Sequence, residues 1–235
     1  MIPISDDNPS ITRPYVNWAL IALCIGVFLW ELSLGQGGAD AAGDLYGFAP
    51  ASLLHPTKVA RLPGELPPYL TIFTSMFLHG GLLHIAGNML YLWIFGNNIE
   101  DAMGHVKYLV FYLLCGIAAA VSFAAMDPAS HMPMIGASGA ISGVLAAYVL
   151  LFPRARVTVI IPLGIIFYPI AISAVWVVGV WFILQLVSAA LSDPSQPGTA
   201  WWAHVGGFAL GLVLTPLFKS ANVPLFGRYP RSPWT

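Results

Sequence analysis

The sequence predicts an all-α fold, a polytopic membrane protein built as a bundle of six transmembrane helices. Hydrophobic residues make up 58% of the 235 residues and only 8% are charged, against about 25% charged residues in a typical soluble domain. Nine Lys and Arg and ten Asp and Glu are too few to cover a water-soluble globule of this size. With a formal net charge of −1, the chain has no basic field to hold nucleic acid, so a nucleic-acid partner is excluded.

Six apolar stretches account for the spans. A straight spanning helix needs roughly 20 apolar residues, and the second and fourth stretches are shorter than this. The fifth stretch, Val157–Leu191, is too long for one span and too short for two with a turn. The spans are predicted at about Val16–Leu34, Leu82–Asn97, Val106–Met126, Ser138–Phe152, Ala171–Leu191 and Trp201–Phe218.

Pro162 and Pro169 interrupt the first part of the fifth stretch. We therefore expect Val157–Ile170 to form an interfacial or re-entrant segment before the fifth helix begins. A seven-span alternative would split this stretch and place the basic C-terminus outside. The distribution of Lys and Arg, which favour the cytoplasmic side, disfavours that alternative.

With six spans and an inner N-terminus, seven Lys and Arg fall on the inner side and only Lys58 and Arg61 on the outer side. We therefore expect a single membrane domain over 1–235, with a short cytoplasmic N-terminus of about 1–15 and a basic cytoplasmic tail of about 219–235. The first outer loop, Gly35 to about Gly81, is long. Its apolar pieces predict a segment that lies in the face of the membrane.

Polar residues inside the second span are the first candidates for a site, because such groups are costly in a bilayer. His84 and Asn88 are four residues apart and so share one helical face. His79 begins the same stretch near the outer surface. The alternative is that His84 and Asn88 only join helices by hydrogen bonds.

Ser138 opens the fourth span among small residues, in the sequence Gly136-Ala137-Ser138-Gly139. A turn that leads directly into a helix would expose this serine and leave backbone N–H groups free to bind an anion. The alternative is a close helix-packing patch, because Gly139 and Gly143 form a G-x-x-x-G pair.

His204 opens the sixth span, with Gly207 and Gly211 on nearly the same face. These glycines would let another helix approach His204 closely. The alternative is a histidine at the membrane interface.

A common depth links these residues. At about 1.5 Å per residue, Asn88, Ser138 and His204 lie roughly 18–22 Å from the cytoplasmic ends of their spans. In a hydrocarbon core of about 30 Å they therefore lie about 10 Å below the outer surface. Serine and histidine at one depth predict a nucleophile and a general base.

No Asp or Glu lies at this depth, so we expect a Ser–His dyad without a third member. Asn88, His84 and the Ser138 N–H group are candidates for an oxyanion hole. Hydrolysis needs a polar cavity open to the outside, and Ser75, His79, Gly80 and Gly81 are expected to line it. Nothing in the sequence calls for a metal or an organic cofactor, and Cys24 and Cys115 are expected to be buried thiols.

From Ile2 to about Phe218, the chain resembles the rhomboid family of intramembrane serine proteases. The resemblance rests on four motifs taken together and in order. These are His84-x-x-x-Asn88, Glu100-x-x-x-Gly104, Gly136-Ala137-Ser138-Gly139, and Ala203-His204 followed by Gly207-x-x-x-Gly211.

The resemblance implies a serine endopeptidase in which Ser138 attacks a peptide bond and His204 transfers the proton. Asn88, His84 and the Ser138 amide would stabilise the oxyanion. Glu100 would fix the cytoplasmic loop after the second span rather than take part in chemistry. The remaining supporting residues are Gly136, Gly139, Gly207, Gly211 and His79.

The implied substrates are transmembrane segments of other membrane proteins, cut near the outer face and entering laterally near the second and fifth helices, where Trp176, Trp181 and Phe182 lie. The implied location is the bacterial inner membrane, with the lipid bilayer as the other partner. Where some members carry an aromatic residue packed on the histidine, this chain has Ser142. Support for the His204 ring must then come from elsewhere or be looser.

Two other functions are weighed against the protease. A catalytically inactive rhomboid-like protein that binds membrane clients would be expected to lack the nucleophile or the base, and both are present. A small transporter would be expected to carry acidic residues or paired broken helices within the membrane, and neither is evident.

Overall fold

A computed structural model describes residues 2–55, 64–163, 166–192 and 199–227. Four of the Lys and Arg residues counted in the charge distribution lie outside these ranges, namely Lys58, Arg61, Arg228 and Arg231. The end of the basic tail also lies outside them. The six predicted spans correspond to α1 (Tyr15–Ser33), α5 (Leu82–Met103), α6 (His105–Met126), α7 (Ser138–Leu151), α8 (Ala174–Leu191) and α9 (Trp201–Phe218).

Within the described residues, four helices are long and apolar enough to cross a membrane, namely α1, α6, α8 and α9. Helix α7 is apolar but has only 14 residues, so the expectation of a short fourth span is confirmed. Large apolar side chains on the outer faces are exposed, among them Trp176, Ile183 and Leu217. A helical bundle with such a surface matches a bilayer environment.

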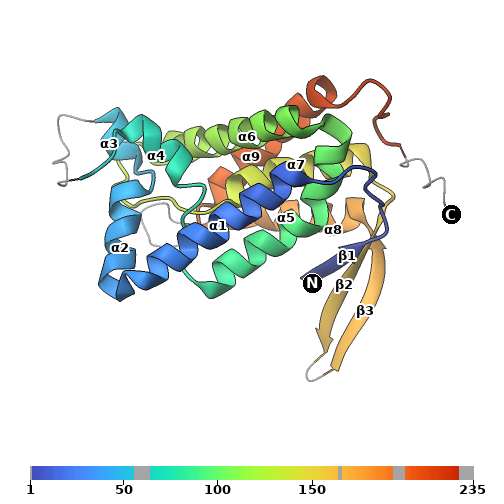
Figure 1. Ribbon diagram of the computed structural model, residues 1–235, viewed down its shortest axis with the longest axis horizontal. Coiled ribbons are helices and arrows are strands. Elements are labelled where there is room, and N and C mark those ends of the chain that lie inside the picture. The colour runs from blue at the N-terminus through green and yellow to red at the C-terminus, as the bar shows by residue number, and fades with distance from the viewer. Residues whose placement is uncertain (1, 56–63, 164–165, 193–198, 228–235) are drawn as a thin grey trace.

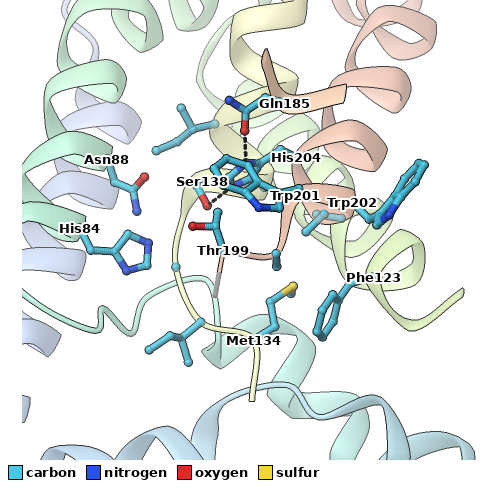
Figure 2. A pocket seen from close by; sticks show the side chains of 18 of the residues that line it. His84, Asn88, Phe123, Met134, Ser138, Gln185, Thr199, Trp201, Trp202 and His204 are labelled. Carbon is cyan, nitrogen blue, oxygen red and sulfur yellow. Dashed lines mark hydrogen bonds between the residues drawn. The ribbon is translucent and has the colours of Figure 1, made fainter. Parts of the chain in front are cut away.

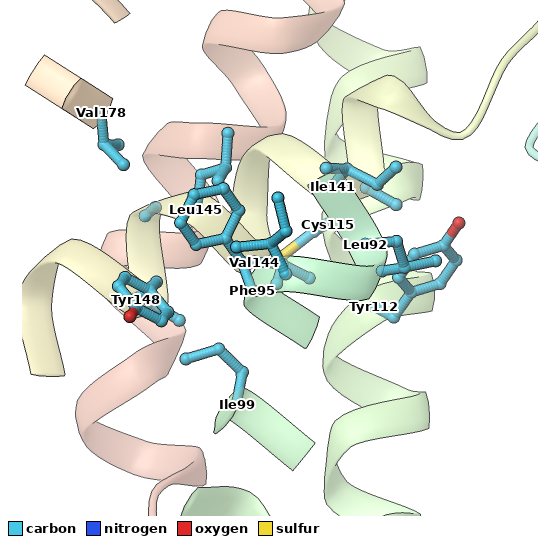
Figure 3. Close-up of a cluster of buried hydrophobic side chains, with 14 of the residues drawn as sticks. Leu92, Phe95, Ile99, Tyr112, Cys115, Ile141, Val144, Leu145, Tyr148 and Val178 are labelled. Carbon is cyan, nitrogen blue, oxygen red and sulfur yellow. The ribbon is translucent and has the colours of Figure 1, made fainter. Parts of the chain in front are cut away.

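Helix α7 forms the centre of the bundle, and most of its residues are buried. It packs against α5, α6, α8 and α9. Figure 1 shows how these helices are arranged. The core around it is apolar and closely packed (Figure 3). That core includes Leu92 and Phe95 of α5, Tyr112 and Cys115 of α6, and Val144 and Leu145 of α7, all fully buried.

The first outer loop contains three short helices, α2 (Gly35–Tyr46), α3 (Pro50–Leu54) and α4 (Pro68–Thr74). They gather at one end of the bundle, opposite the β-sheet (Figure 1). The backbone N–H of Phe48 donates to the carbonyl of Met134, and that of Met134 donates to the carbonyl of Phe48. The loop is thereby joined to the segment that leads into α7.

A three-stranded antiparallel sheet was not predicted. It has the order β1-β2-β3, with β1 (Ile2–Asp6), β2 (Arg156–Leu163) and β3 (Ile166–Ser173). The segment expected to be interfacial or re-entrant, Val157–Ile170, is thus part of a β-hairpin, in keeping with the β-branched run from Val157 to Ile161, which favours a strand. Its position relative to the membrane stays a prediction. Pro169 is tolerated because β3 is an edge strand.

Two helix boundaries differ from the prediction by more than one residue. Helix α5 continues to Met103, well past the predicted end at Asn97. Polar residues after Asn97 end the apolar stretch, but they do not interrupt the helix. It ends at Gly104, whose φ of +82° is readily adopted by glycine. Helix α8 begins at Ala174 rather than Ala171, because β3 occupies the residues before it.

Candidate active site

Ser138 is the first residue of α7, and the turn before it depends on Gly136. The backbone of Gly136 has a φ of +118°, a conformation that a residue with a side chain rarely adopts. Its N–H donates to the carbonyl of Ser75 at 2.8 Å. This turn presents Ser138 at a helix N-terminus, where backbone N–H groups lack partners within the helix.

The Ser138 hydroxyl and the His204 ring lie within hydrogen-bond distance. The Oγ of Ser138 is 2.7 Å from Nε2 of His204 (Figure 2). Helices α7 and α9 can approach this closely because glycines face one another. A Cβ on Gly207 would lie 2.0 Å from the carbonyl oxygen of Gly139, and one on Gly211 would lie 2.6 Å from Gly143.

A third polar side chain, which sequence reasoning missed, completes this arrangement. The Oε1 of Gln185, on α8, is 2.6 Å from Nδ1 of His204. The signal was present in the sequence, because Gln185 is a strongly polar residue within an apolar span and such residues are functional candidates. The expected Ser–His pair therefore extends to a chain of three side chains from three helices.

The His204 ring is also held by aromatic side chains. The centroid of Trp181 lies 6.1 Å from that of His204, and the centroid of Trp201 lies 6.0 Å away at a near-perpendicular angle. Ser142, which replaces the aromatic residue of some rhomboid members, donates its hydroxyl proton to the carbonyl of Ser138 at 2.7 Å. Support for the ring thus comes from α8 and from the start of α9.

His84 and Asn88 line the same cavity from α5, across from Ser138 (Figure 2). A Cβ on Gly136 would lie 2.6 Å from Nε2 of His84 and 3.7 Å from Nδ2 of Asn88. The Nδ2 group of Asn88 is buried and has no hydrogen-bond partner. A buried donor without a partner is costly, so its retention beside Ser138 points to a ligand or reacting group that accepts from it.

The cavity has a volume of about 900 Å³, which lies within the usual range for ligand sites. Its lining combines the polar residues above with apolar side chains, including Phe123, Met134, Trp201 and Trp202. Among the residues that the structure describes, no group of three His, Cys, Asp or Glu side chains could hold a metal ion.

The residues expected to line the entrance divide into two groups. Gly80 lines the cavity, whereas Ser75, His79 and Gly81 do not. Ser75 and His79 are instead buried in the segment before α5. The N–H of His79 donates to a carboxylate oxygen of Glu31 at 3.1 Å.

Burial and the nearby His84 lower the pKa of His79 to about 4. This ring, which lies in the turn before α5, is therefore neutral at pH 7. Its centroid lies 5.2 Å from that of His84, nearly edge to face. Such a contact places His79 as a neighbour of His84 and not as a lining residue of the cavity.

Glu100 lies far from the cavity, at the opposite end of α5. Its carboxylate accepts from the N–H groups of Val16 at 2.9 Å and Asn17 at 2.7 Å, two donors at the start of α1 that have no partner within that helix. It also contacts Nδ1 of His105, at the start of α6. Glu100 thus joins the ends of three helices and is fully buried.

Comparison with known proteins gives these motifs a family. The Rhomboid domain family matches residues 67–221. The rhomboid protease GluP of Bacillus subtilis is 37% identical over 136 residues, which is 57% of this chain and 24% of GluP. RHOMBOID-like protein 4 of Arabidopsis thaliana is 30% identical over 143 residues, 61% of this chain and 32% of that protein.

The human mitochondrial presenilin-associated rhomboid-like protein is 36% identical over 88 residues, 37% of this chain and 23% of that protein. The matched regions thus cover only about a quarter to a third of these relatives. The family match itself extends over more than half of this chain, from the short helix α4 to the residues after α9. On this evidence the chain belongs to the rhomboid family.

Proposed function

We propose that the protein is an intramembrane serine endopeptidase that cuts transmembrane segments of other membrane proteins. The observation that carries this proposal is the 2.7 Å distance between Oγ of Ser138 and Nε2 of His204. A hydroxyl group becomes a competent nucleophile when a positioned base can take its proton. The pair lies in a cavity large enough to admit a peptide segment.

In the proposed reaction, Oγ of Ser138 attacks the carbonyl carbon of the peptide bond while its proton moves to Nε2 of His204. The tetrahedral intermediate collapses, the C–N bond breaks, and His204 gives the proton to the leaving amine. Water then attacks the acyl-enzyme ester with His204 again as the base. Ser138 regains its proton and the new carboxylate leaves.

The oxyanion of the intermediate would be stabilised by Asn88, His84 and the backbone N–H of Ser138. Two observations support this assignment. The Nδ2 group of Asn88 is a buried donor without a partner, and Ser138 begins a helix, where the dipole favours negative charge. Donors arranged in advance around a developing charge are usually the largest single contribution to catalysis.

Entry of the substrate is proposed between α5 and α8. The ring of Trp181 on α8 lies 6.5 Å from that of Tyr91 on α5, and both residues line the cavity. Phe182 stacks on Phe208 of α9 at 3.9 Å, while Trp176 is largely exposed on the outer face of α8. A transmembrane segment could reach Ser138 from the bilayer where these side chains separate.

We further propose that the chain forms one membrane domain in a bacterial inner membrane, with both termini in the cytoplasm. The sequence distribution of Lys and Arg supports this orientation. The cavity would then open toward the outer side, where α2, α3 and α4 gather. Cysteine labelling of exposed positions on α2 and of the β-sheet in intact cells would test the orientation.

Cleavage of a transmembrane reporter by the purified protein in liposomes tests the function. Ser138→Ala and His204→Ala are each expected to lose cleavage, with folding retained. Ser142→Ala is the matched control, because Ser142 lies one turn later on the same helix and is expected to keep activity. Cleavage that persists in Ser138→Ala preparations would contradict the serine mechanism.

A further inference from the structure

We propose that Gln185 is a positioning residue that holds the His204 ring in the tautomer needed for a general base. This inference rests on the proposed function of Ser138 and His204. Gln185 comes from α8, a third helix, and its side chain is only 7% exposed. Its Oε1 lies 2.6 Å from Nδ1 of His204, on the side of the ring opposite Ser138 (Figure 2).

The orientation of the Gln185 amide follows from its second hydrogen bond. Its Nε2 group donates to the carbonyl of Trp181 at 3.3 Å, one turn earlier on the same helix. A carbonyl oxygen can only accept, so the NH₂ end of the amide must face Trp181. The opposite orientation would place two acceptor oxygens against each other, and therefore Oε1 is the atom that faces His204.

This orientation determines which ring nitrogen carries the proton. Because Oε1 can only accept, Nδ1 of His204 must donate a proton to it. In a neutral ring Nε2 is then free of hydrogen and can accept the proton of Ser138. Without an acceptor at Nδ1, the proton can reside on Nε2, and in that tautomer the ring cannot act as a base toward Ser138.

Among the residues that the structure describes, the acceptor that faces Nδ1 of His204 is Oε1 of Gln185. His204 is buried, and its ring is also flanked by Trp181 and Trp201, whose indole N–H groups are donors only. Gln185 thus takes the place that a carboxylate holds in a Ser–His–Asp triad, but as a neutral group. A neutral partner orients the ring without adding a charge within the membrane, where a charged residue is costly.

Two substitutions of Gln185 separate positioning from packing. Gln185→Met keeps the unbranched shape of the side chain and removes the acceptor, which leaves Nδ1 of His204 unpaired. For a buried polar group left unpaired, kcat for reporter cleavage is expected to fall about 10- to 100-fold. KM is expected to change little. Gln185→Glu keeps an acceptor and is expected to restore much of kcat. An ionised Glu would also stabilise the imidazolium, so the acid limb of the kcat/KM profile would move to higher pH.

Leu184→Ala is the control, because Leu184 is the neighbouring residue and is exposed on the outer face of α8. This variant is expected to keep the kcat of the parent protein. Equal losses in Leu184→Ala and Gln185→Met would show that only the packing of α8 matters and would overturn the proposal. An unchanged kcat in Gln185→Met, or an equal loss in Gln185→Glu with no shift of the acid limb, would also overturn it.

A spectroscopic measurement tests the same inference without relying on cleavage. In protein labelled with ¹⁵N-histidine, the signals of His204 are assigned by their loss in His204→Ala. We expect a protonated Nδ1 in the parent protein and a growing Nε2–H population in Gln185→Met; equal tautomer populations in the two proteins would overturn the proposal. If Ser138→Ala still cleaves, the proposed function fails while this measurement still decides the role of Gln185.

Discussion

Gly207 of α9 lies directly against the backbone of Gly139 in α7, so that a Cβ on Gly207 would lie 2.0 Å from the Gly139 carbonyl oxygen. Gly207 lies three positions after His204, and Gly139 lies one position after Ser138. The contact therefore sets how closely the two helices approach at the level of the proposed dyad. The hydrogen bond between Ser138 and His204 depends on a separation that only glycine permits here.

Gly207→Ala is expected to destabilise the protein and to separate Ser138 from His204. Inserting a methyl group against backbone atoms typically costs about 1–3 kcal/mol, which thermal unfolding in detergent would detect. Reporter cleavage is expected to fall further than the loss of folded protein explains. Gly179→Ala on α8 is the control, since nothing lies within 4 Å of its Cβ position; equal stability of the two variants would contradict the close approach.

Asn88→Ala is expected to lower kcat by about 10²–10³, the range for removal of one oxyanion donor, with little effect on KM. The reason is that Nδ2 of Asn88 has no partner in the structure and, in the proposed mechanism, gains one only when the oxyanion forms. Steady-state kinetics on the transmembrane reporter measure both constants. Asn97→Ala is the control, because Asn97 lies on the same helix but outside the cavity lining, and it should keep the kcat and KM of the parent protein. A rise in KM alone for Asn88→Ala would instead assign Asn88 to substrate binding.

The sequence predicted the six-helix bundle and the family, because apolar length and the polar motifs are local properties of the chain. It also predicted that His84, Asn88, Ser138 and His204 lie near one another, since helix rise converts residue counts into depth. The structure places these side chains around one cavity. Their catalytic roles stay a prediction.

Two features could not be predicted in the same way. The sheet pairs Ile2–Asp6 with residues from Val157 to Ile160, and such a distant pairing leaves no periodic trace in either segment. The contact of Gln185 with His204 depends on the rotation of α8 about its axis, which packing against α9 determines. The polarity of Gln185 indicated a candidate, but not its partner.

Glu100→Ala is expected to destabilise the protein by about 2–4 kcal/mol, because two N–H groups at the start of α1, one buried and one partly buried, would lose their acceptor. Glu100→Gln keeps one acceptor oxygen and should therefore lower the stability of the protein less than Glu100→Ala does. In both variants, the kcat of the folded fraction is expected to match the parent, since Glu100 lies outside the cavity. Unfolding curves together with active-site titration separate the two effects; a lowered kcat per titrated site would contradict a purely structural role.

The sheet and the central helix are joined by a group that titrates. The hydroxyl of Tyr148 on α7 donates to a carboxylate oxygen of Asp6 in β1. Burial raises the pKa of Asp6 from 3.8 to about 6, although the hydrogen bond from Tyr148 acts in the opposite direction. The folded state therefore binds this proton more tightly than the unfolded state does.

The sign of the resulting pH dependence follows from linkage. The protonated carboxyl group of Asp6 stabilises the folded state. This stabilisation is fully present below about pH 4 and is lost as pH rises through about 6. It amounts to about 1–3 kcal/mol. Asp6→Asn is neutral at every pH, so its Tm relative to the parent protein should increase between pH 4 and pH 7 and then stay level. Asp44→Asn, at an exposed position on α2, is the control for the substitution itself. A constant difference in Tm between Asp6→Asn and the parent across this range would mean that Asp6 does not titrate in this way.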